Sequence, residues 1–167
     1  MAPKDSTDSF LQLPVTVASR VDVGRLLRET ESVASFMDQA SIREPGKALK
    51  LPRTSRLFDE ITTNNHLNVL QQHDRERLTL FLQEIKAHSP VLHISFSADP
   101  SPLFVQRLLT WLRAEIHPVL LLQIGLQPNI GAGCVVRTTN KYFDFSLRTR
   151  FKETSPQLAA LLKGATG

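Results

Sequence analysis

The chain has 167 residues, of which 41% are hydrophobic and 22% charged. This balance excludes a disordered or collagen-like chain and fits one globular domain or two small ones. The single cysteine, Cys134, excludes an internal disulfide and a cysteine-based zinc site, so we expect a reducing compartment. No apolar run reaches the ~20 residues of a membrane span. The first residues also lack the apolar segment of a secretory signal, and we therefore expect a soluble chain.

The net charge of +4 comes entirely from the C-terminal end. Residues 1–130 contain fourteen basic and fourteen acidic side chains, whereas residues 131–167 contain six basic and two acidic ones. This asymmetry indicates an anionic partner, which would be nucleic acid, a lipid surface or an acidic protein. A solvated basic face is the alternative interpretation.

The N-terminal half predicts a flexible arm followed by a helical bundle. Residues 1–20 have prolines and no helical period, which is typical of an arm or tail. Apolar residues then recur at helical spacing, and a proline- and glycine-containing surface loop separates the first two of three amphipathic segments. We expect these helices at residues 22–42, 54–65 and 74–88, and the loop at residues 43–52. They predict a small bundle domain over residues 21–89.

The ends of the second helix have specific signals. Thr54 or Ser55 can cap its first N–H groups. Asn64 and Asn65 tolerate the left-handed conformation in which many helices end. The sequence therefore predicts a short helix with a defined start and stop.

After Ser89 and Pro90 the apolar period changes from 3.6 to 2, as expected for a strand near residues 91–97. Proline in a first turn then predicts a helix from residue 102, with an apolar row formed by Phe104, Leu108, Leu112 and Ile116. The apolar segment at residues 119–127 predicts a central strand. We expect a β-hairpin next and a last helix over residues 147–163, interrupted at Ser155 and Pro156.

These elements predict an α+β protein in which the helical bundle precedes a β-α-β-β-β-α domain with a mixed sheet. The second domain would span residues 90–167. The change of period at its start is the boundary signal.

No residue pattern indicates an active site. Cys134 lies within an expected strand, where a buried structural thiol is the simpler interpretation. The five histidines form no i, i+4 pair that could hold a metal ion. The loop around Gly131 and Gly133 leads into a strand rather than a helix, so we interpret it as a bend and not a phosphate site. We therefore expect no catalytic, cofactor or metal site, and no enzyme.

The C-terminal aromatics leave a nucleic-acid alternative open. Tyr142, Phe143 and Phe145 lie in the basic hairpin and could stack on bases. Because alternate residues of a strand point to opposite faces, only Tyr142 and one neighbour are expected to be exposed. A small basic nucleic-acid-binding module is thus the rival interpretation.

The order of elements and one motif resemble the delta subunit of the rotary F-type ATP synthase, the oligomycin-sensitivity-conferring protein family. The family signature is a glycine, a short strand ending in arginine, a hairpin, and an Asp-x-Ser-x-Arg-x-Arg run. It is matched here by Gly133, Arg137, Asp144, Ser146, Arg148 and Arg150. The segment LFDEITTNNHLNVL, with Asn65 and Leu67, is similar to the family's helix and Asn-x-x-Leu turn. The similarity covers about residues 22–155. Compared with the family, either the N-terminal helical domain is shortened or residues 1–20 supply part of it.

The resemblance implies a non-catalytic stator. In this family the helical domain binds N-terminal segments of the alpha subunits, and the C-terminal domain holds the b subunit of the peripheral stalk. By this resemblance, Gly133, Arg137, Asp144, Ser146, Asn65 and Leu67 would shape the fold. Contacts with partners would come from Arg148, Arg150, Lys152, Leu26, Leu27 and Phe58. The implied location is the cytoplasmic face of a bacterial plasma membrane. The resemblance implies no cofactor.

Overall fold

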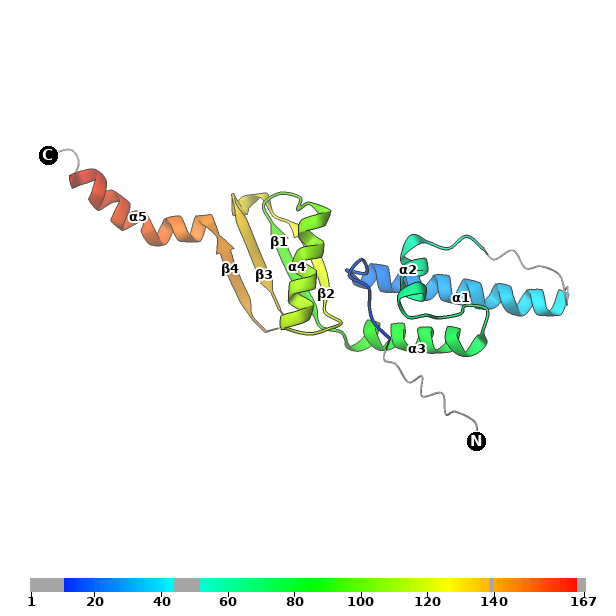
Figure 1. The fold of residues 1–167 in the computed structure, drawn as a ribbon. Coiled ribbons are helices and arrows are strands. Elements are labelled where there is room, and N and C mark those ends of the chain that lie inside the picture. Colours follow the sequence, from blue (N-terminus) through cyan, green and yellow to red (C-terminus); the bar gives the residue numbers. More distant parts are fainter. Residues whose placement is uncertain (1–10, 44–51, 139, 165–167) are drawn as a thin grey trace, which may run out of the picture. The chain divides into compact units, whose positions relative to one another are not determined.

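The computed structural model describes residues 11–43, 52–138 and 140–164 (Figure 1). The chain divides into two compact units, Met1–Ser89 and Pro90–Gly167. The described residues contain five α-helices, three of them in the first unit, and a four-stranded mixed sheet in the second. The predicted α+β class is therefore confirmed. Residues 1–10 of the expected arm and most of the loop expected at residues 43–52 lie outside the described residues.

The first helix, α1 (Arg20–Arg43), begins at a reciprocal cap. The Ser19 backbone N–H and hydroxyl donate to Asp22 Oδ2 at 2.9 and 2.8 Å, and the Asp22 N–H donates to Ser19 Oγ at 3.3 Å. Such a pair satisfies N–H groups that have no partner within the helix. The helix predicted over residues 22–42 is therefore confirmed as α1.

Helix α2 (Arg56–Asn64) begins at Ser55, one of the two predicted caps. The Ser55 hydroxyl accepts from the Phe58 N–H at 3.3 Å and donates to Glu29 Oε2 at 2.8 Å. Glu29 also accepts from the Ser55 N–H at 3.2 Å, so a carboxylate of α1 lies at the positive end of α2. This contact connects the two helices.

Helix α3 (Gln72–His88) begins two residues before the predicted start at residue 74. The Asp74 carboxylate lies in its first turn and accepts from the Asn68 N–H at 2.8 Å. Arg75, although charged, is buried, because its guanidinium donates to the carbonyls of Val69 and Leu70 at 2.9 and 3.0 Å. These contacts fix the α2–α3 connection.

The prediction of an arm was wrong for residues 11–19, which pack on the helices. Leu13 and Val17 are buried there. Gln12 donates its N–H to Asn65 Oδ1 at 2.6 Å and accepts from Asn65 Nδ2 at 2.9 Å. Helix α2 ends at Asn64 with Asn65 as its C-cap, so the predicted stop is confirmed, but neither asparagine is the left-handed residue, which is His66 with φ of 53°. The Asn65 side chain instead joins residues 11–19 to the helices.

The core of the first unit lies between α1 and α3, with α2 closing one side (Figure 1). Its buried side chains come from the predicted apolar faces of all three helices. They include Val23, Leu26, Leu27, Val33, Phe58, Ile61, Leu78, Leu82 and Ile85. Thr30 and Thr62 are also buried, because each hydroxyl donates to the carbonyl four residues earlier in its helix.

The second unit contains the sheet, in the order β2-β1-β3-β4. Strand β1 pairs in parallel with β2 and antiparallel with β3, and β3 pairs antiparallel with β4. The bounds are β1 (Val91–Phe96), α4 (Pro102–Glu115), β2 (Leu121–Leu126), the 3-10 turn η1 (Pro128–Ile130), β3 (Gly133–Arg137), β4 (Tyr142–Ser146) and α5 (Leu147–Gly164). The predicted hairpin is confirmed as β3–β4.

Two apolar patterns in this unit were misread. The segment predicted as a central strand is the edge strand β2, in which Leu121 and Leu122 are buried while Leu126 is exposed. The predicted row of α4 leaves Phe104 and Ile116 exposed. A strict i, i+4 row drifts by about 40° per step around a helix, so its two ends leave the buried face. Leu112 of the predicted row is buried as expected, and Leu109, which the row omitted, is buried with it.

Helix α5 runs through Pro156, so the expected interruption was wrong. Its described side chains from Leu147 to Pro156, a stretch in which Thr149 is not described, are all exposed. The helix follows β4 without an intervening loop. Its first three turns therefore lack the covered face that α1 and α4 have.

Candidate functional site

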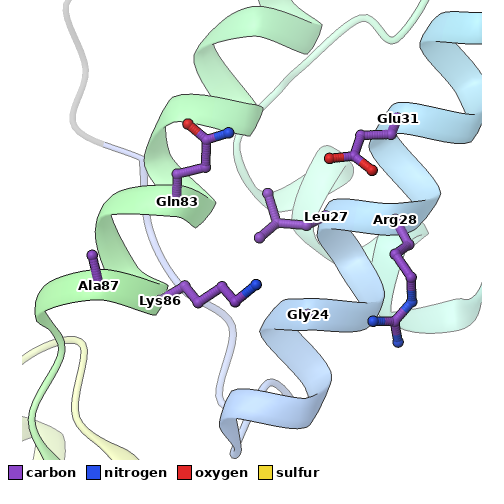
Figure 2. Close-up of a pocket in the computed structure, with 7 residues that line it drawn as sticks. All are labelled: Gly24, Leu27, Arg28, Glu31, Gln83, Lys86 and Ala87. Atoms are coloured by element: carbon purple, nitrogen blue, oxygen red, sulfur yellow. The ribbon is translucent and has the colours of Figure 1, made fainter.

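A groove runs between α1 and α3 in the first unit and encloses about 510 Å³ (Figure 2). Figure 2 shows Leu27 directed from α1 toward α3, and Lys86 directed from α3 toward α1. Gly24 opens the wall on the α1 side because it has no side chain. The full lining is Gly24, Leu27, Arg28, Glu31, Gln83, Lys86 and Ala87.

The groove is lined by two apolar side chains, Leu27 and Ala87, and by four polar ones, of which two are cations and one is an anion. A β-carbon on Gly24 would meet only Arg28 Nη1, at an ordinary 3.7 Å. The helix could thus accept a larger residue here, and the glycine keeps the groove open. This composition suits the apolar face of a helix whose flanking residues are polar.

Only one of the three apolar residues expected to meet a partner lines this groove. Leu27 does so. Leu26 and Phe58 are 0% and 2% exposed and lie in the core, so they are not available to a partner; Leu27 is also a core residue, 7% exposed, and only its edge reaches the groove. Helical spacing identifies an apolar face, but it does not separate the residues that fill the core from those at its border.

Gly133 of the sequence motif occupies a position that only glycine fits. Its φ is +96°, and an added β-carbon would lie against the Phe145 carbonyl oxygen and 3.1 Å from Ser146 Cα. The nearby Gly131 also has a positive φ, +75°, but no atom lies within 4 Å of the added carbon. The expected bend is therefore present, and at Gly133 the backbone of β4 packs directly against it.

The next motif residues shape the end of β4. The Ser146 N–H donates to Asp144 Oδ1 at 2.8 Å, and Ser146 is buried opposite Gly133. Arg137 pairs with Tyr142 across the hairpin and places its guanidinium 5.8 Å from the ring centroid. These contacts lie within the hairpin and at the end of β4.

Asn65 and Leu67 also have contacts within the fold. Besides its bonds to Gln12, Asn65 Nδ2 donates to the Ile61 carbonyl at 2.8 Å. The Leu67 N–H donates to the Thr62 carbonyl at 2.9 Å, and the side chain is half-buried. Both residues stabilise the turn after α2.

The aromatics of β4 are more exposed than the alternation rule predicted. Phe143 and Phe145 lie on the sheet face that contains Ile94 and Phe96, as the register shows. Helix α4 packs on part of this face, where Phe104 meets Phe96 edge-on at 5.9 Å and where Ile94 and Leu122 are buried. It leaves Ile124 and Leu126 of β2 exposed and lies away from β4 (Figure 1). Phe143 and Phe145 are therefore 42% and 61% exposed, and Tyr142 is exposed on the other face.

The three predicted contact cations, Arg148, Arg150 and Lys152, are all exposed on α5. The same helix exposes Leu147 and Phe151, one turn apart. We name Phe143, Phe145, Leu147 and Phe151 the apolar run. Sequence reasoning missed it because it assigned the strand aromatics to a covered core.

Cys134 is half-buried in β3. Burial raises the pKa of its thiol, so the unreactive protonated form dominates near neutral pH. In the part of the chain that the structure describes, no three histidine, cysteine, aspartate or glutamate side chains could hold a metal ion together.

No described helix has both the length and the apolar composition to cross a membrane. A scan against models of protein families matches none of them, and a search of curated proteins gives no match. The function must therefore be argued from the two surfaces and the motif.

Proposed function

We propose that this chain is a peripheral-stalk subunit of a rotary F-type ATP synthase, located at the cytoplasmic face of a bacterial membrane. In this role the helical unit binds an N-terminal segment of an alpha subunit, and the C-terminal unit binds the b subunit. The chain then holds the catalytic head against the torque of the rotor. It is not an enzyme in this proposal and needs no cofactor.

The observation that carries the proposal is the presence of a separate surface for a protein partner on each unit. The groove of the first unit offers Leu27 and Ala87 between the charged residues Arg28 and Lys86. The second unit offers the apolar run beside exposed cations. A linker between two protein assemblies requires one such surface for each of them.

The sequence motif adds support because its residues occupy demanding positions. Gly133 cannot carry a side chain there, and Asp144 binds the backbone of Ser146 at the start of α5. If the motif matched by chance, its glycine would not be expected to fall at a position where a β-carbon would clash with the opposite strand.

The second candidate, a nucleic-acid-binding module, is favoured by the exposed aromatics Tyr142, Phe143 and Phe145 next to basic residues. Its binding would depend on phosphate contacts and fall steeply with salt. A protein partner held by apolar contacts would resist the same change.

The experiment is affinity capture of tagged chain from gently solubilised membranes of the source organism, with mass spectrometry after a moderate salt wash. We expect the alpha, beta and b subunits of the synthase. The variant Gly24→Leu places a larger side chain at the groove, where its β-carbon meets only Arg28 Nη1 at 3.7 Å, and should lose the alpha and beta subunits while retaining b. Ser32→Leu adds the same side chain at an exposed α1 position outside the groove and should retain all three.

Recovery of nucleic acid and its binding proteins without any synthase subunit would overturn the proposal. If Gly24→Leu and Ser32→Leu lose the same partners, the groove is not the site that binds the catalytic head.

A further inference from the structure

We infer that the open edge of β2, the edge that faces away from β1, pairs antiparallel with the same edge of a second copy of this chain. The pairing joins the two sheets into one. Backbone hydrogen bonds make the contact, and apolar side chains lie beside them. The inference goes beyond the proposed function, because that function assigns no partner to β2 and does not require one there.

Strand β2 is the first strand of the order β2-β1-β3-β4, so only one of its edges is paired within the sheet (Figure 1). The N–H groups of Leu121 and Gln127 donate toward β1, to the carbonyls of Pro90 and Phe96, at 3.0 and 2.8 Å. Alternate residues of a strand direct their backbone groups to the same side. The odd-numbered residues of β2 therefore face β1, and the even-numbered ones face the open edge.

The even-numbered residues of β2 are Leu122, Ile124 and Leu126. Among the described residues, no hydrogen bond joins their N–H groups to another part of the chain. Leu122 is buried, whereas Ile124 and Leu126 are 38% and 60% exposed. The open edge thus combines free backbone groups with exposed apolar side chains.

This edge lacks the features that keep most edge strands from pairing, which are a charged residue, a proline or a bulge. The strand LLQIGL has neither charge nor proline, and its register with β1 is regular over all six residues. The opposite edge strand, β4, has Asp144 at its centre. One edge of the sheet is therefore protected against pairing, and the other is not.

The absence of charge favours a second copy over a different partner. Identical edges bring identical side chains together, so a charged residue on the edge would meet a like charge. Residues 116–136 contain no Lys, Arg, Asp or Glu, and two copies meet here without repulsion although each has a net charge of +4. Recognition of another protein by charge would need a charged residue on β2.

The pairing also has a defined register. A two-fold axis at Ile124 places this residue opposite its counterpart, and Leu122 opposite Leu126 of the second copy. Every residue that directs its backbone groups outward then meets another such residue, as a hydrogen-bonded antiparallel pair requires. Opposing side chains lie on the same face of a sheet, so the exposed Ile124 and Leu126 gain apolar neighbours.

Sedimentation equilibrium of the full chain, from about 1 µM to about 100 µM, tests the association. We expect the average mass to rise with concentration from 18.7 kDa toward twice this value and to stop there, because a two-fold contact closes. A single-chain mass at every concentration would overturn the inference. Growth beyond the dimer would also overturn it, since an open-ended contact is not two-fold.

Two lysine variants locate the contact. Ile124 and Phe143 lie in one row of the sheet, at opposite edges, and are 38% and 42% exposed. Ile124→Lys places like charges opposite each other and removes the apolar contact, so it should weaken the dimer by about tenfold or more. Phe143→Lys is the matched control and should leave the dimer unchanged. Retention of the dimer in Ile124→Lys, or its loss in Phe143→Lys, would contradict the inference.

A mixture of two variants tests the register. Ile124→Glu alone should dimerise as poorly as Ile124→Lys, whereas an equal mixture of the two should form dimers, because opposite charges then face each other. Circular dichroism confirms that each variant is folded. Failure of the mixture to dimerise would contradict the pairing of these two positions.

Hydrogen exchange of the unsubstituted chain tests the backbone pairing without any variant. The N–H groups of Leu122, Ile124 and Leu126 should exchange about tenfold or more slowly at the high concentration than at the low one. Exchange in β4 should not depend on concentration. If the mass doubles while exchange in β2 stays the same, the copies associate through another surface and the inference fails.

Discussion

The two units of this chain bury their apolar residues to different extents. In the first unit, α1, α2, α3 and residues 11–19 enclose one core, and Val21, Leu70 and Leu80 are the large hydrophobic residues exposed among those described. In the second unit, one helix covers part of one sheet face, and eleven of the fourteen exposed large hydrophobic residues described belong to this unit.

This difference shows two ways to build a binding surface. The helical unit completes its own core and leaves a concave groove, which is kept open by a glycine. The sheet unit leaves part of its apolar surface uncovered, so a partner would supply the missing layer. In the helical unit, most of the residues that stabilise the fold are not those that would bind a partner. In the sheet unit, binding of a partner would also bury apolar residues that the fold leaves uncovered.

The largest effect should come from Gly133→Ala, which tests how tightly the uncovered hairpin is built. The positive φ and the contact with the Phe145 carbonyl together should lower the free energy of unfolding by about 4 kcal/mol. Urea denaturation followed by circular dichroism measures this change. Gly131→Ala has a positive φ but no nearby atom and should cost only about 1 kcal/mol. Equal losses at the two glycines would mean that the close approach to β4 is absent.

A second pair of variants compares the two units directly. Leu82→Ala removes a fully buried side chain from the helical core and should cost about 3 kcal/mol. Phe145→Ala removes a larger side chain from an exposed position and should cost less than about 1 kcal/mol. Thermal unfolding of the two variants measures both effects. A loss at Phe145 as large as that at Leu82 would show that the sheet face is covered in the isolated chain, and the contrast between the units would disappear.

A smaller effect is expected for Asn65→Ala, which releases residues 11–19 from the helices. The variant loses the two bonds to Gln12 and the bond to Ile61, at a cost of about 2 kcal/mol. Hydrogen exchange at the Gln12 amide should become faster, whereas exchange within the sheet should stay unchanged. Asn64→Ala, at an exposed neighbour, is the control. Persisting protection of Gln12 would indicate that apolar contacts alone hold this segment.

Local signals predicted most of the elements. Ser55 was identified as a cap because serine accepts from the first N–H groups of a helix, and the hairpin was identified from its short β-rich runs. These features depend on residues close together in the chain. The bend at Gly133 was predicted as well, because glycine tolerates the positive φ that a tight bend requires.

The errors concern contacts between distant residues. Asn64 and Asn65 were correctly predicted as the end of α2, but the hydrogen bonds between the Asn65 side chain and Gln12, which is far away in the sequence, were not foreseen. The strand at residues 121–126 looked central because it is apolar, yet its position at the edge depends on how β1 and β3 pair. Phe143 and Phe145 share a face with the core, and only the limited coverage by α4 leaves them exposed. Neither the groove nor the apolar run could be located without this tertiary information.

Gly24 and Gly133 are under opposite structural constraints, and these predict different patterns of substitution in evolution. Any side chain at Gly133 damages the fold, so the position should stay glycine in every descendant of this chain, whatever it binds. Gly24 lies inside a helix, where alanine would be more stable by up to about 1 kcal/mol and no atom obstructs it. A lineage that stopped using the groove would gain stability by filling it. The residue at position 24 would thus record whether the groove is still in use.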